Sequence, residues 1–229
     1  VAIVGCGFVA DLYMRSLRLY PDIKVALVYD RDRLRLRQFC DYWHLPSTGS
    51  LAQILEDDSI HVVLNLTNPS SHFEISRACL LAGKHVYSEK PLAIAMSEAR
   101  ELHDLARDRG LMLASAPCSY LSTVARNLAF ALGQSRPGRP YLVYAELDDD
   151  FIPQAPYAKW RSESGARWPH EDEFRVGCTL EHAGYYLTWM MMLFGTVRRV
   201  VAASAELLTE KLSGDATAPD YSTAVLFFE

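Results

Sequence analysis

Short apolar runs alternate with helical patterns along the first half of the chain. Five strand-like runs lie at 1–4, 24–30, 61–67, 85–89 and 111–116. All but 85–89 are apolar at most positions, which is typical of strands buried on both faces. The intervening segments predict helices at 8–19, 33–43, 50–57, 71–82 and 95–109. Strands alternating with helices predict an α/β fold, in which a parallel sheet is doubly wound by helices on both faces.

The rhythm changes after Pro117, where the pattern predicts a second, α+β domain. We expect helices at 122–132 and 178–195, strands at 141–148, 197–207 and 222–229, and a long polar loop at 148–175. The predicted domains are therefore 1–118 and 119–229. Both ends of the chain lie inside strand patterns, so we expect missing residues at both ends, and more of them at the C-terminus.

Composition narrows the class of protein. The chain has 229 residues, half of them hydrophobic, and a net charge of −5. It carries no basic block typical of nucleic-acid binding and no apolar run long enough to span a membrane. Five scattered cysteines without a C-x-x-C pair predict free thiols rather than disulfides or a metal site. We expect a cytoplasmic protein that binds neither nucleic acid nor a membrane.

The first strand leads into a glycine loop. Gly5, Gly7 and Ala10 form the pattern G-x-G-x-x-A between a strand and a helix, with Phe8 and Val9 inside it. Gly5 permits the tight turn, Gly7 lets the backbone approach a pyrophosphate, and Ala10 lets the helix lie close to the strand. The N–H groups of the helix N-terminus favour phosphate binding. These residues predict a dinucleotide site, although a glycine turn without a ligand is the simpler alternative.

An acidic residue ends the second strand. Asp30 lies twenty residues after Ala10, where a carboxylate is expected to meet the ribose hydroxyls of the adenosine. A carboxylate repels a 2′-phosphate, so Asp30 favours NAD. Arg31 next to it can pair with a phosphate or stack on adenine, which leaves NADP as the alternative. Arg31 can equally be a solvated charge at the start of a helix.

Polar residues follow the third strand at the carboxyl edge of the predicted sheet. Thr67, Asn68 and Pro69 lie where cofactors bind in open α/β sheets. His72 comes one turn later. It is either a cofactor contact or a first-turn surface residue, and the pattern favours neither.

Glu89, Lys90 and Pro91 follow the fourth strand. A partly desolvated lysine at this edge can hold or pass a proton, although a loop salt bridge is the plainer interpretation. The glycine loop together with "AGKHVYSEKPLA" resembles the glucose-fructose oxidoreductase/inositol dehydrogenase/MocA family. The likeness covers the first domain well and the second loosely.

The resemblance implies an NAD(P)-dependent oxidoreductase of sugars, cyclitols and related compounds, with a role in carbohydrate metabolism. It also implies that Lys90 is the catalytic-site lysine and that Glu89 lies at the cofactor. The family's second domain contains a large, mostly antiparallel sheet, which mediates oligomerisation in many members. We therefore expect a homo-oligomer formed through this sheet.

The polar start of the helix at 178–195 falls on the family's catalytic helix. Aligned on its L-F-G end, Glu181 and Thr188 match two acids and Tyr185 matches a histidine. Residues 181, 185 and 188 would share one helical face. Tyr185, whose unperturbed pKa is about 10, or His182 is then the expected acid/base, with Glu181 orienting it. Packing of the tyrosines and solvation of Glu181 and His182 is the alternative.

Three further residues are substrate candidates. Trp160 and Arg161 match a W-R pair of the family, and Tyr120 follows the last predicted Rossmann strand. The long loop can instead be a surface excursion held by its tryptophans. The sequence thus predicts hydride transfer between a nicotinamide and a small polar substrate. A non-catalytic NAD(P) sensor and an imine or enone reductase are the alternatives.

Overall fold

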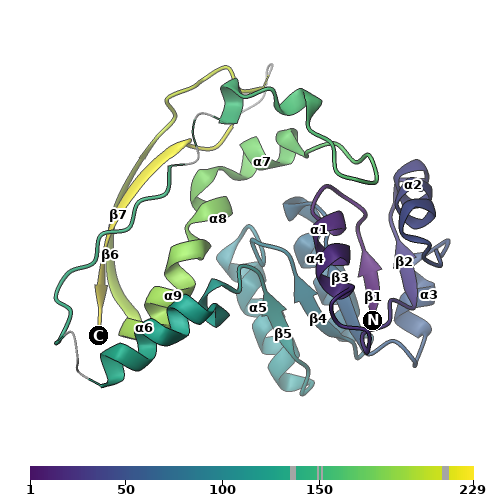
Figure 1. Ribbon diagram of the computed structural model, residues 1–229, viewed down its shortest axis with the longest axis horizontal. Helices are drawn as coiled ribbons and strands as arrows, with labels where there is room; N and C mark the ends of the chain where they lie inside the picture. Colours follow the sequence, from purple (N-terminus) through teal and green to yellow (C-terminus); the bar gives the residue numbers. More distant parts are fainter. Residues whose placement is uncertain (135–137, 149, 151, 213–216) are drawn as a thin grey trace. The chain divides into compact units, whose positions relative to one another are not determined.

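The structure is a computed structural model of the chain, which describes residues 1–134, 138–148, 150, 152–212 and 217–229. It contains two compact units (Figure 1). The first comprises Val1–Ala116 and Ala155–Glu173, and the second comprises Pro117–Gln154 and Phe174–Glu229. Because each unit uses two separate stretches of chain, the functional division at residue 118 stays a prediction.

The first unit contains a five-stranded parallel sheet, as predicted. Its strands are β1 (Ala2–Val4), β2 (Leu27–Tyr29), β3 (Val62–Asn65), β4 (His85–Ser88) and β5 (Leu113–Ser115). They lie in the order β2-β1-β3-β4-β5 (Figure 1). The chain moves from β1 to β2 on one side and then to β3 on the other. The carboxyl ends of β1 and β3 are therefore the switch point of the sheet, where open α/β folds bind ligands.

Helices cover both faces of this sheet. They are α1 (Ala10–Leu17), α2 (Arg33–Trp43), α3 (Leu51–Glu56), η1 (Pro69–Ser71), α4 (His72–Leu81) and α5 (Met96–Asp108). Successive residues of β1 point to opposite faces, as a strand requires. Ala2 packs in one cluster with Leu102 of α5, and Ile3 packs in the other with Phe39 of α2. These two cores confirm the predicted doubly wound sheet.

The stretch 155–173 belongs to the first unit and has more regular structure than the predicted loop. It contains η4 (Tyr157–Lys159) and most of α7 (His170–Val176), and η3 (Ile152–Gln154) precedes it. A loop was predicted over 148–175, and these helical elements were not expected within it. The start of α7 is visible in the sequence, because Glu171, Asp172 and Glu173 supply the acidic first turn that favours a helix start.

The second unit combines helices with a two-stranded antiparallel sheet. Its elements are η2 (Ser119–Leu121), α6 (Thr123–Gly133), α8 (Cys178–His182), α9 (Gly184–Phe194), β6 (Val197–Ala205) and β7 (Tyr221–Phe228). Val197 pairs with Phe228 at one end of the ladder and Ala205 with Tyr221 at the other. This arrangement confirms the predicted α+β class of the second half.

Two predictions in the second unit were wrong. Residues 141–148 are not a strand: they pair with no strand in the described part of the chain, and Tyr141 and Tyr144 are 90% and 91% exposed. Alternation alone does not make a strand, because a strand needs a ladder partner. The helix at 178–195 is divided into α8 and α9 at Ala183. Gly184 follows the break, and a glycine weakens a helix.

Candidate functional site

The glycine loop after β1 is fixed by close backbone contact with the loop after β3. Gly5 has φ +98°, and a Cβ at this position would lie 2.5 Å from the carbonyl carbon of Leu66. Only glycine fits this turn. A Cβ at Gly7 would meet only the Leu66 carbonyl oxygen, at 3.9 Å, so the space outside Gly7 is open. The loop therefore presents bare backbone at the start of α1.

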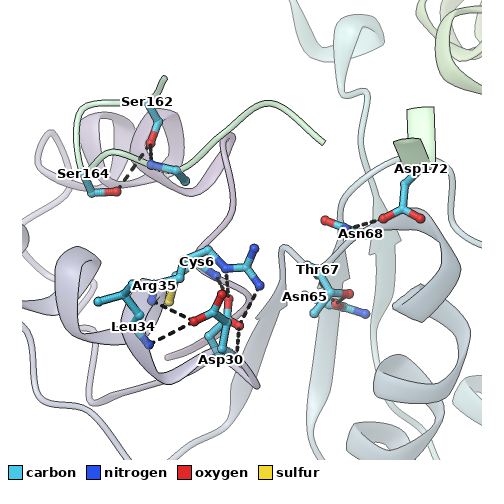
Figure 2. Close-up of polar contacts among 12 residues, drawn as sticks. Cys6, Asp30, Leu34, Arg35, Asn65, Thr67, Asn68, Ser162, Ser164 and Asp172 are labelled. Carbon is cyan, nitrogen blue, oxygen red and sulfur yellow. Dashed lines mark hydrogen bonds and ion pairs between the residues drawn. The ribbon is translucent and has the colours of Figure 1, made fainter. Parts of the chain in front are cut away.

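Asp30, at the end of β2, is buried and fully engaged. One oxygen accepts hydrogen bonds from the Cys6 N–H at 2.8 Å and Arg35 Nε at 3.0 Å. The other accepts from the Asp32 N–H at 2.8 Å and Arg35 Nη2 at 3.0 Å. Figure 2 shows this cluster beside the glycine loop. Protein donors thus occupy the four acceptor positions of the carboxylate.

Arg35 is a residue that sequence reasoning missed, because Arg31 lies next to Asp30 in the chain. Arg31 is exposed, whereas Arg35 reaches back to the end of β2 from the first turn of α2. Asp32 caps this helix, and its carboxylate accepts from the N–H groups of Leu34 and Arg35. The signal that would have found Arg35 is the N-cap, which fixes where the helix begins and therefore which side chains face Asp30.

Cys6 lies inside the glycine loop but is not a nucleophile. Burial raises the pKa of its thiol far above the ordinary value, and the nearby Asp30 carboxylate raises it further. The thiol therefore stays protonated at neutral pH. A thiolate is the reactive form, so Cys6 serves packing.

A pocket opens at the switch point of the sheet. Its wall combines the glycine loop, the loop after β3, the loop after β4 and part of the 155–173 stretch. It is lined by Gly7, Phe8, Val9, Leu66, Thr67, Asn68, Pro69, His72, Glu89, Lys90, Trp168, Pro169 and Glu173. Most of the predicted cofactor residues thus line one cavity. Gly5, Ala10, Asp30 and Arg31 do not line it, and contact of any of these residues with a cofactor stays a prediction.

Glu89 connects α1 to the loop that carries Lys90. One of its oxygens accepts the Tyr13 hydroxyl at 2.7 Å, and the other accepts the Lys90 N–H at 2.8 Å. Burial, and then the Glu89 carboxylate, raise the pKa of Tyr13 far above its ordinary value. Tyr13 therefore stays a neutral donor. The glutamate fixes the backbone at Lys90, and Lys90 itself lines the pocket.

His72 is not the surface residue that one interpretation of the sequence allowed. It is fully buried at the start of α4. Its Nδ1 lies 2.6 Å from the Pro91 carbonyl oxygen, and its Nε2 lies 2.9 Å from the Thr67 carbonyl oxygen. The Asn65 side chain accepts the Thr67 hydroxyl and donates to the His72 carbonyl. His72 thus connects the loop after β3 to the loop after β4.

The stretch 155–173 is attached to the rest of the first unit through Ser164 and Asp172, besides contacts of Glu163 with Arg15 and Tyr42. The buried Asp11 carboxylate of α1 accepts hydrogen bonds from the N–H and hydroxyl of Ser164, at 3.0 and 2.9 Å. The Asn68 side chain donates to Asp172 (Figure 2). Between these attachments, Trp168 contributes to the pocket wall. Sequence reasoning missed these contacts because they join residues more than a hundred positions apart.

The predicted substrate residues of this stretch form an aromatic cluster. The rings of Trp160 and Trp168 lie 5.2 Å apart, and Tyr157 packs 5.9 Å from Trp168. The Arg161 guanidinium donates to the carbonyls of Ala158 and Trp160. These contacts fit the interpretation of a stretch held by its tryptophans. Substrate contact by Trp160 and Arg161 stays a prediction.

The second unit holds the remaining candidates. Glu181 of α8 is buried, and the His182 ring stacks on Tyr185 with centroids 6.4 Å apart. Tyr120 is exposed in η2. The break at Ala183 lies between Glu181 and Tyr185, so the shared helical face also stays a prediction.

Membrane spans and metal clusters are both missing from the described residues. None of the helices described is long and apolar enough to cross a membrane. No group of three or more His, Cys, Asp or Glu residues in the described ranges is placed to hold a metal ion.

Comparison with known proteins identifies the fold family. Residues 1–116 match the model of the GFO_IDH_MocA family, described as an oxidoreductase family with an NAD-binding Rossmann fold. The chain belongs to this family. The matched residues cover the whole sheet of the first unit, so the resemblance noted in the sequence is confirmed, and with it the NAD-binding Rossmann domain.

Individual relatives match more of the chain than the family model does. Human trans-1,2-dihydrobenzene-1,2-diol dehydrogenase is 28% identical over 196 residues, which are 84% of this chain and 55% of that protein. The WlbA dehydrogenase of Bordetella pertussis, solved with NADH and UDP-GlcNAcA, has a TM-score of 0.77 at 19% identity. That match covers 99% of this chain and 62% of the other.

A third similar protein is the biliverdin reductase of Synechocystis sp., solved with biliverdin and NADP+. It has a TM-score of 0.67 at 24% identity, over 99% of this chain and 67% of that one. At these identities the structural likenesses establish the fold. The chain spans about half the length, or less, of the curated relatives that it matches.

Proposed function

We propose that the chain is part of an NAD(P)-dependent oxidoreductase that acts on a sugar-like, cyclitol-like or related small polar substrate. The observation that carries the proposal is the pocket at the switch point, where the bare glycine loop and Lys90 share one wall. An NAD-binding family fold with a lysine at this edge is suited to hydride chemistry.

The residues of the pocket fit a dinucleotide. The open space outside Gly7 leaves room for a pyrophosphate where a Cβ would stand, and Gly7 lies directly before the N-terminus of α1. Phe8 and Val9 complete that turn, and their backbone N–H groups are the proposed donors to phosphate oxygens, whereas the Ala10 N–H donates to the Gly7 carbonyl. Thr67, Asn68, Pro69 and His72 form the opposite wall. When bound, the nicotinamide supplies the hydride acceptor or donor.

Lys90 acts on the substrate side in this proposal. Glu89 holds its backbone, so its ammonium group is directed from a fixed loop. A lysine there stabilises negative charge on a substrate oxygen and holds or passes its proton. Tyr185 and His182 stay the candidate acid/base groups, with Glu181 orienting one of them, on the strength of the sequence match. Tyr120, Trp160 and Arg161 are the proposed substrate contacts.

Cofactor choice is part of the same proposal. NAD requires that ribose hydroxyls reach Asp30, which in turn requires Arg35 to move aside. NADP would instead use a released Arg35 as a phosphate partner. We propose NAD as the cofactor, with NADP as the alternative that titration decides.

A tyrosine at the position of the family's histidine favours one second candidate. A phenol is a suitable proton donor when a C=C or C=N bond is reduced, because the donor need not accept a proton from an alcohol. Reduction of an imine or enone is therefore the second candidate function. An NAD(P) sensor without turnover is the remaining outcome of the test.

The test measures NADH and NADPH absorbance with a panel of polyols, amino sugars, their oxidised forms, imines and enones. Lys90→Ala is expected to lower turnover about a hundredfold or more while leaving dinucleotide affinity within about threefold. Lys24→Ala is the matched control, because Lys24 is exposed and outside the pocket. Turnover that survives Lys90→Ala unchanged would contradict the assignment. Dinucleotide binding without turnover on any substrate would favour the sensor.

A further inference from the structure

The buried imidazole of His72 has carbonyl oxygens at both ring nitrogens. The Pro91 carbonyl oxygen lies 2.6 Å from Nδ1, and the Thr67 carbonyl oxygen lies 2.9 Å from Nε2. Among the seven histidines, all within the described part of the chain, His72 is the one that is buried. Both distances are those of hydrogen bonds.

The number of N–H donors that the two contacts require indicates the charge of this ring. A carbonyl oxygen accepts hydrogen bonds and donates none. A neutral imidazole has one N–H donor, so one of its two nitrogens would turn a lone pair toward a carbonyl oxygen. An imidazolium has two N–H donors and makes both bonds.

The two carbonyls belong to the two loops that carry the pocket. Thr67 follows β3 in the loop that contacts the glycine loop. Pro91 follows Lys90 directly, so a bond to its carbonyl fixes the loop on which Lys90 stands. Asn65 holds the Thr67 hydroxyl and the His72 carbonyl, which anchors the ring's own backbone. His72 therefore sets the position of Lys90 relative to Thr67.

Burial and the helix work against a charge at this position. His72 is the first residue of α4, where the helix dipole disfavours a cation, and the ring is fully buried. The titratable groups that line the same pocket are Glu89 and Lys90 from the loop after β4 and Glu173 from α7, and the exposed Glu74 lies in the first turn of its own helix. Two hydrogen bonds to carbonyl oxygens favour the charged form and act against these effects.

We propose that His72 is a positioning residue that carries a buried imidazolium, which ties the Lys90–Pro91 loop to the Thr67 loop. Its proton is a structural part of the pocket. Without one of the two hydrogen bonds, one of the two loops is released and Lys90 is displaced. The relevance of this displacement to catalysis rests on the proposed function, whereas the charge and the tie do not.

Nitrogen NMR of histidine-labelled protein tests the charge directly. The His72 signals are assigned by their loss in His72→Asn, or in His72→Gln should the first variant not fold. Two protonated ring nitrogens at neutral pH are the expected result. The exposed His103 is the internal reference for a ring that exchanges protons with solvent. One unprotonated nitrogen on His72 at neutral pH would overturn the proposal.

NMR of methyl-labelled lysines tests whether His72 connects the Lys90–Pro91 loop to the Thr67 loop. The chain has five lysines, Lys24, Lys84, Lys90, Lys159 and Lys211, so their dimethylamino carbon signals are few enough to assign. His72→Asn keeps a donor near Nδ1 for Pro91, and His72→Gln keeps one near Nε2 for Thr67. The Lys90 signal is expected to shift in His72→Gln and to move less in His72→Asn, while the Lys24 signal stays in place. An unchanged Lys90 signal in both folded variants would overturn the tie.

These measurements need no substrate, so their outcome is separate from that of the turnover test. If turnover is found, His72→Gln is expected to lower kcat about tenfold, because the alignment of Lys90 is lost. Equal kcat in wild type and His72→Gln would confine His72 to folding and contradict its positioning role.

Discussion

The guanidinium of Arg35 donates two parallel hydrogen bonds to the carboxylate of Asp30, each 3.0 Å long. The pair stands beside the glycine loop, because the same carboxylate accepts the Cys6 N–H. A bidentate pair of this kind is geometrically specific and stronger than a single contact. Asp30, the residue predicted to bind ribose, is therefore already paired with Arg35. The choice of cofactor depends on whether Arg35 keeps this pair when a dinucleotide binds.

Replacement of Arg35 by Met removes the guanidinium and keeps most of the side-chain volume. We expect NADPH affinity to fall about tenfold or more, because one charge-assisted partner of a 2′-phosphate is lost. NADH affinity is expected to rise or to stay within about threefold, since Asp30 is then open to ribose hydroxyls. Fluorescence titration of both cofactors measures these affinities. Arg31→Met is the control, and a loss of NADPH affinity confined to that variant would assign the phosphate contact to Arg31 instead.

Alanine substitutions at three glycines distinguish the effects of backbone strain, of close packing and of lost space for the cofactor. Gly5→Ala is expected to lower the free energy of unfolding by about 3 kcal/mol or more, because its Cβ would overlap the Leu66 backbone. Gly83→Ala isolates the strain of positive φ, since Gly83 has φ +77° and a Cβ there would meet nothing within 4 Å. It is expected to cost about 1 kcal/mol. Denaturant unfolding measures both values.

Gly7→Ala is the functional member of this set. Its Cβ meets only the Leu66 carbonyl oxygen, at 3.9 Å, so we expect stability within about 1 kcal/mol of wild type. NADH affinity is expected to fall about tenfold or more, because the methyl group occupies the space proposed for the pyrophosphate. Calorimetric titration with NADH measures the loss. Undiminished affinity in a well-folded variant would place the phosphates elsewhere.

Asp32 gives α2 a pH-dependent cap. The hydrogen bond from the Arg35 N–H lowers the pKa of its carboxyl below the ordinary value; burial opposes this, and the Leu34 N–H lowers the pKa further. A lowered pKa in the folded state stabilises the protein above the unfolded pKa of about 4, and this contribution is lost as pH falls through the folded pKa. Asp32→Ala is expected to destabilise by about 1 kcal/mol at pH 7 and by less at pH 3.

Thermal unfolding at the two pH values measures the cap of α2. Asp32→Ser is the matched control, because a serine caps the helix without a titrating group and its stability should not follow the same pH profile. A loss in Asp32→Ala that is the same at pH 3 and pH 7 would show that the charge of Asp32 contributes nothing.

The Asp11 carboxylate anchors the 155–173 stretch. It accepts from Trp43 Nε1 at 2.5 Å as well as from Ser164, and it is 2% exposed. Asp11→Ala leaves these donors unpaired and is expected to cost about 3 kcal/mol. Ser164→Ala removes only the hydroxyl bond and is expected to cost about 1 kcal/mol.

Limited proteolysis within 155–173 measures how firmly the stretch is attached. Cleavage is expected to be faster in Ser164→Ala than in wild type, because one attachment is weakened while the fold is kept. Tyr42→Phe is the control: it removes an exposed hydrogen bond to Glu163 of the same stretch, and cleavage should change little. Equal cleavage rates in all three proteins would show that Asp11 does not hold the stretch.

The sheet of the first unit could be predicted from sequence because its determinants are local. Each strand but β4 is an apolar run, and the helix at Arg33–Trp43 was placed with the bounds that the structure has, since Asp32 caps it. The glycine loop likewise follows from G-x-G-x-x-A. Sequence and structure agree where one short segment carries the whole signal.

The errors arose where a partner distant in sequence decides the structure. Residues 141–148 alternate like a strand but find no ladder partner in the described part of the chain. Ser164 and Asp172 were missed because their partners are fixed by tertiary packing, whereas Arg35 was missed although the Asp32 N-cap places it near Asp30. His72 was undecided between surface and site for the same reason: nothing in its own helix places the Pro91 carbonyl beside it.

The central claim is that a dinucleotide lies with its pyrophosphate on the glycine loop and its nicotinamide toward Lys90. A crystal structure of the protein with NADH tests it most directly. The account predicts phosphate oxygens within hydrogen-bond distance of the backbone N–H groups between Gly7 and Ala10, and the nicotinamide ring at the Lys90 side of the pocket. A dinucleotide bound away from Gly7, or none bound at saturating NADH, would contradict it.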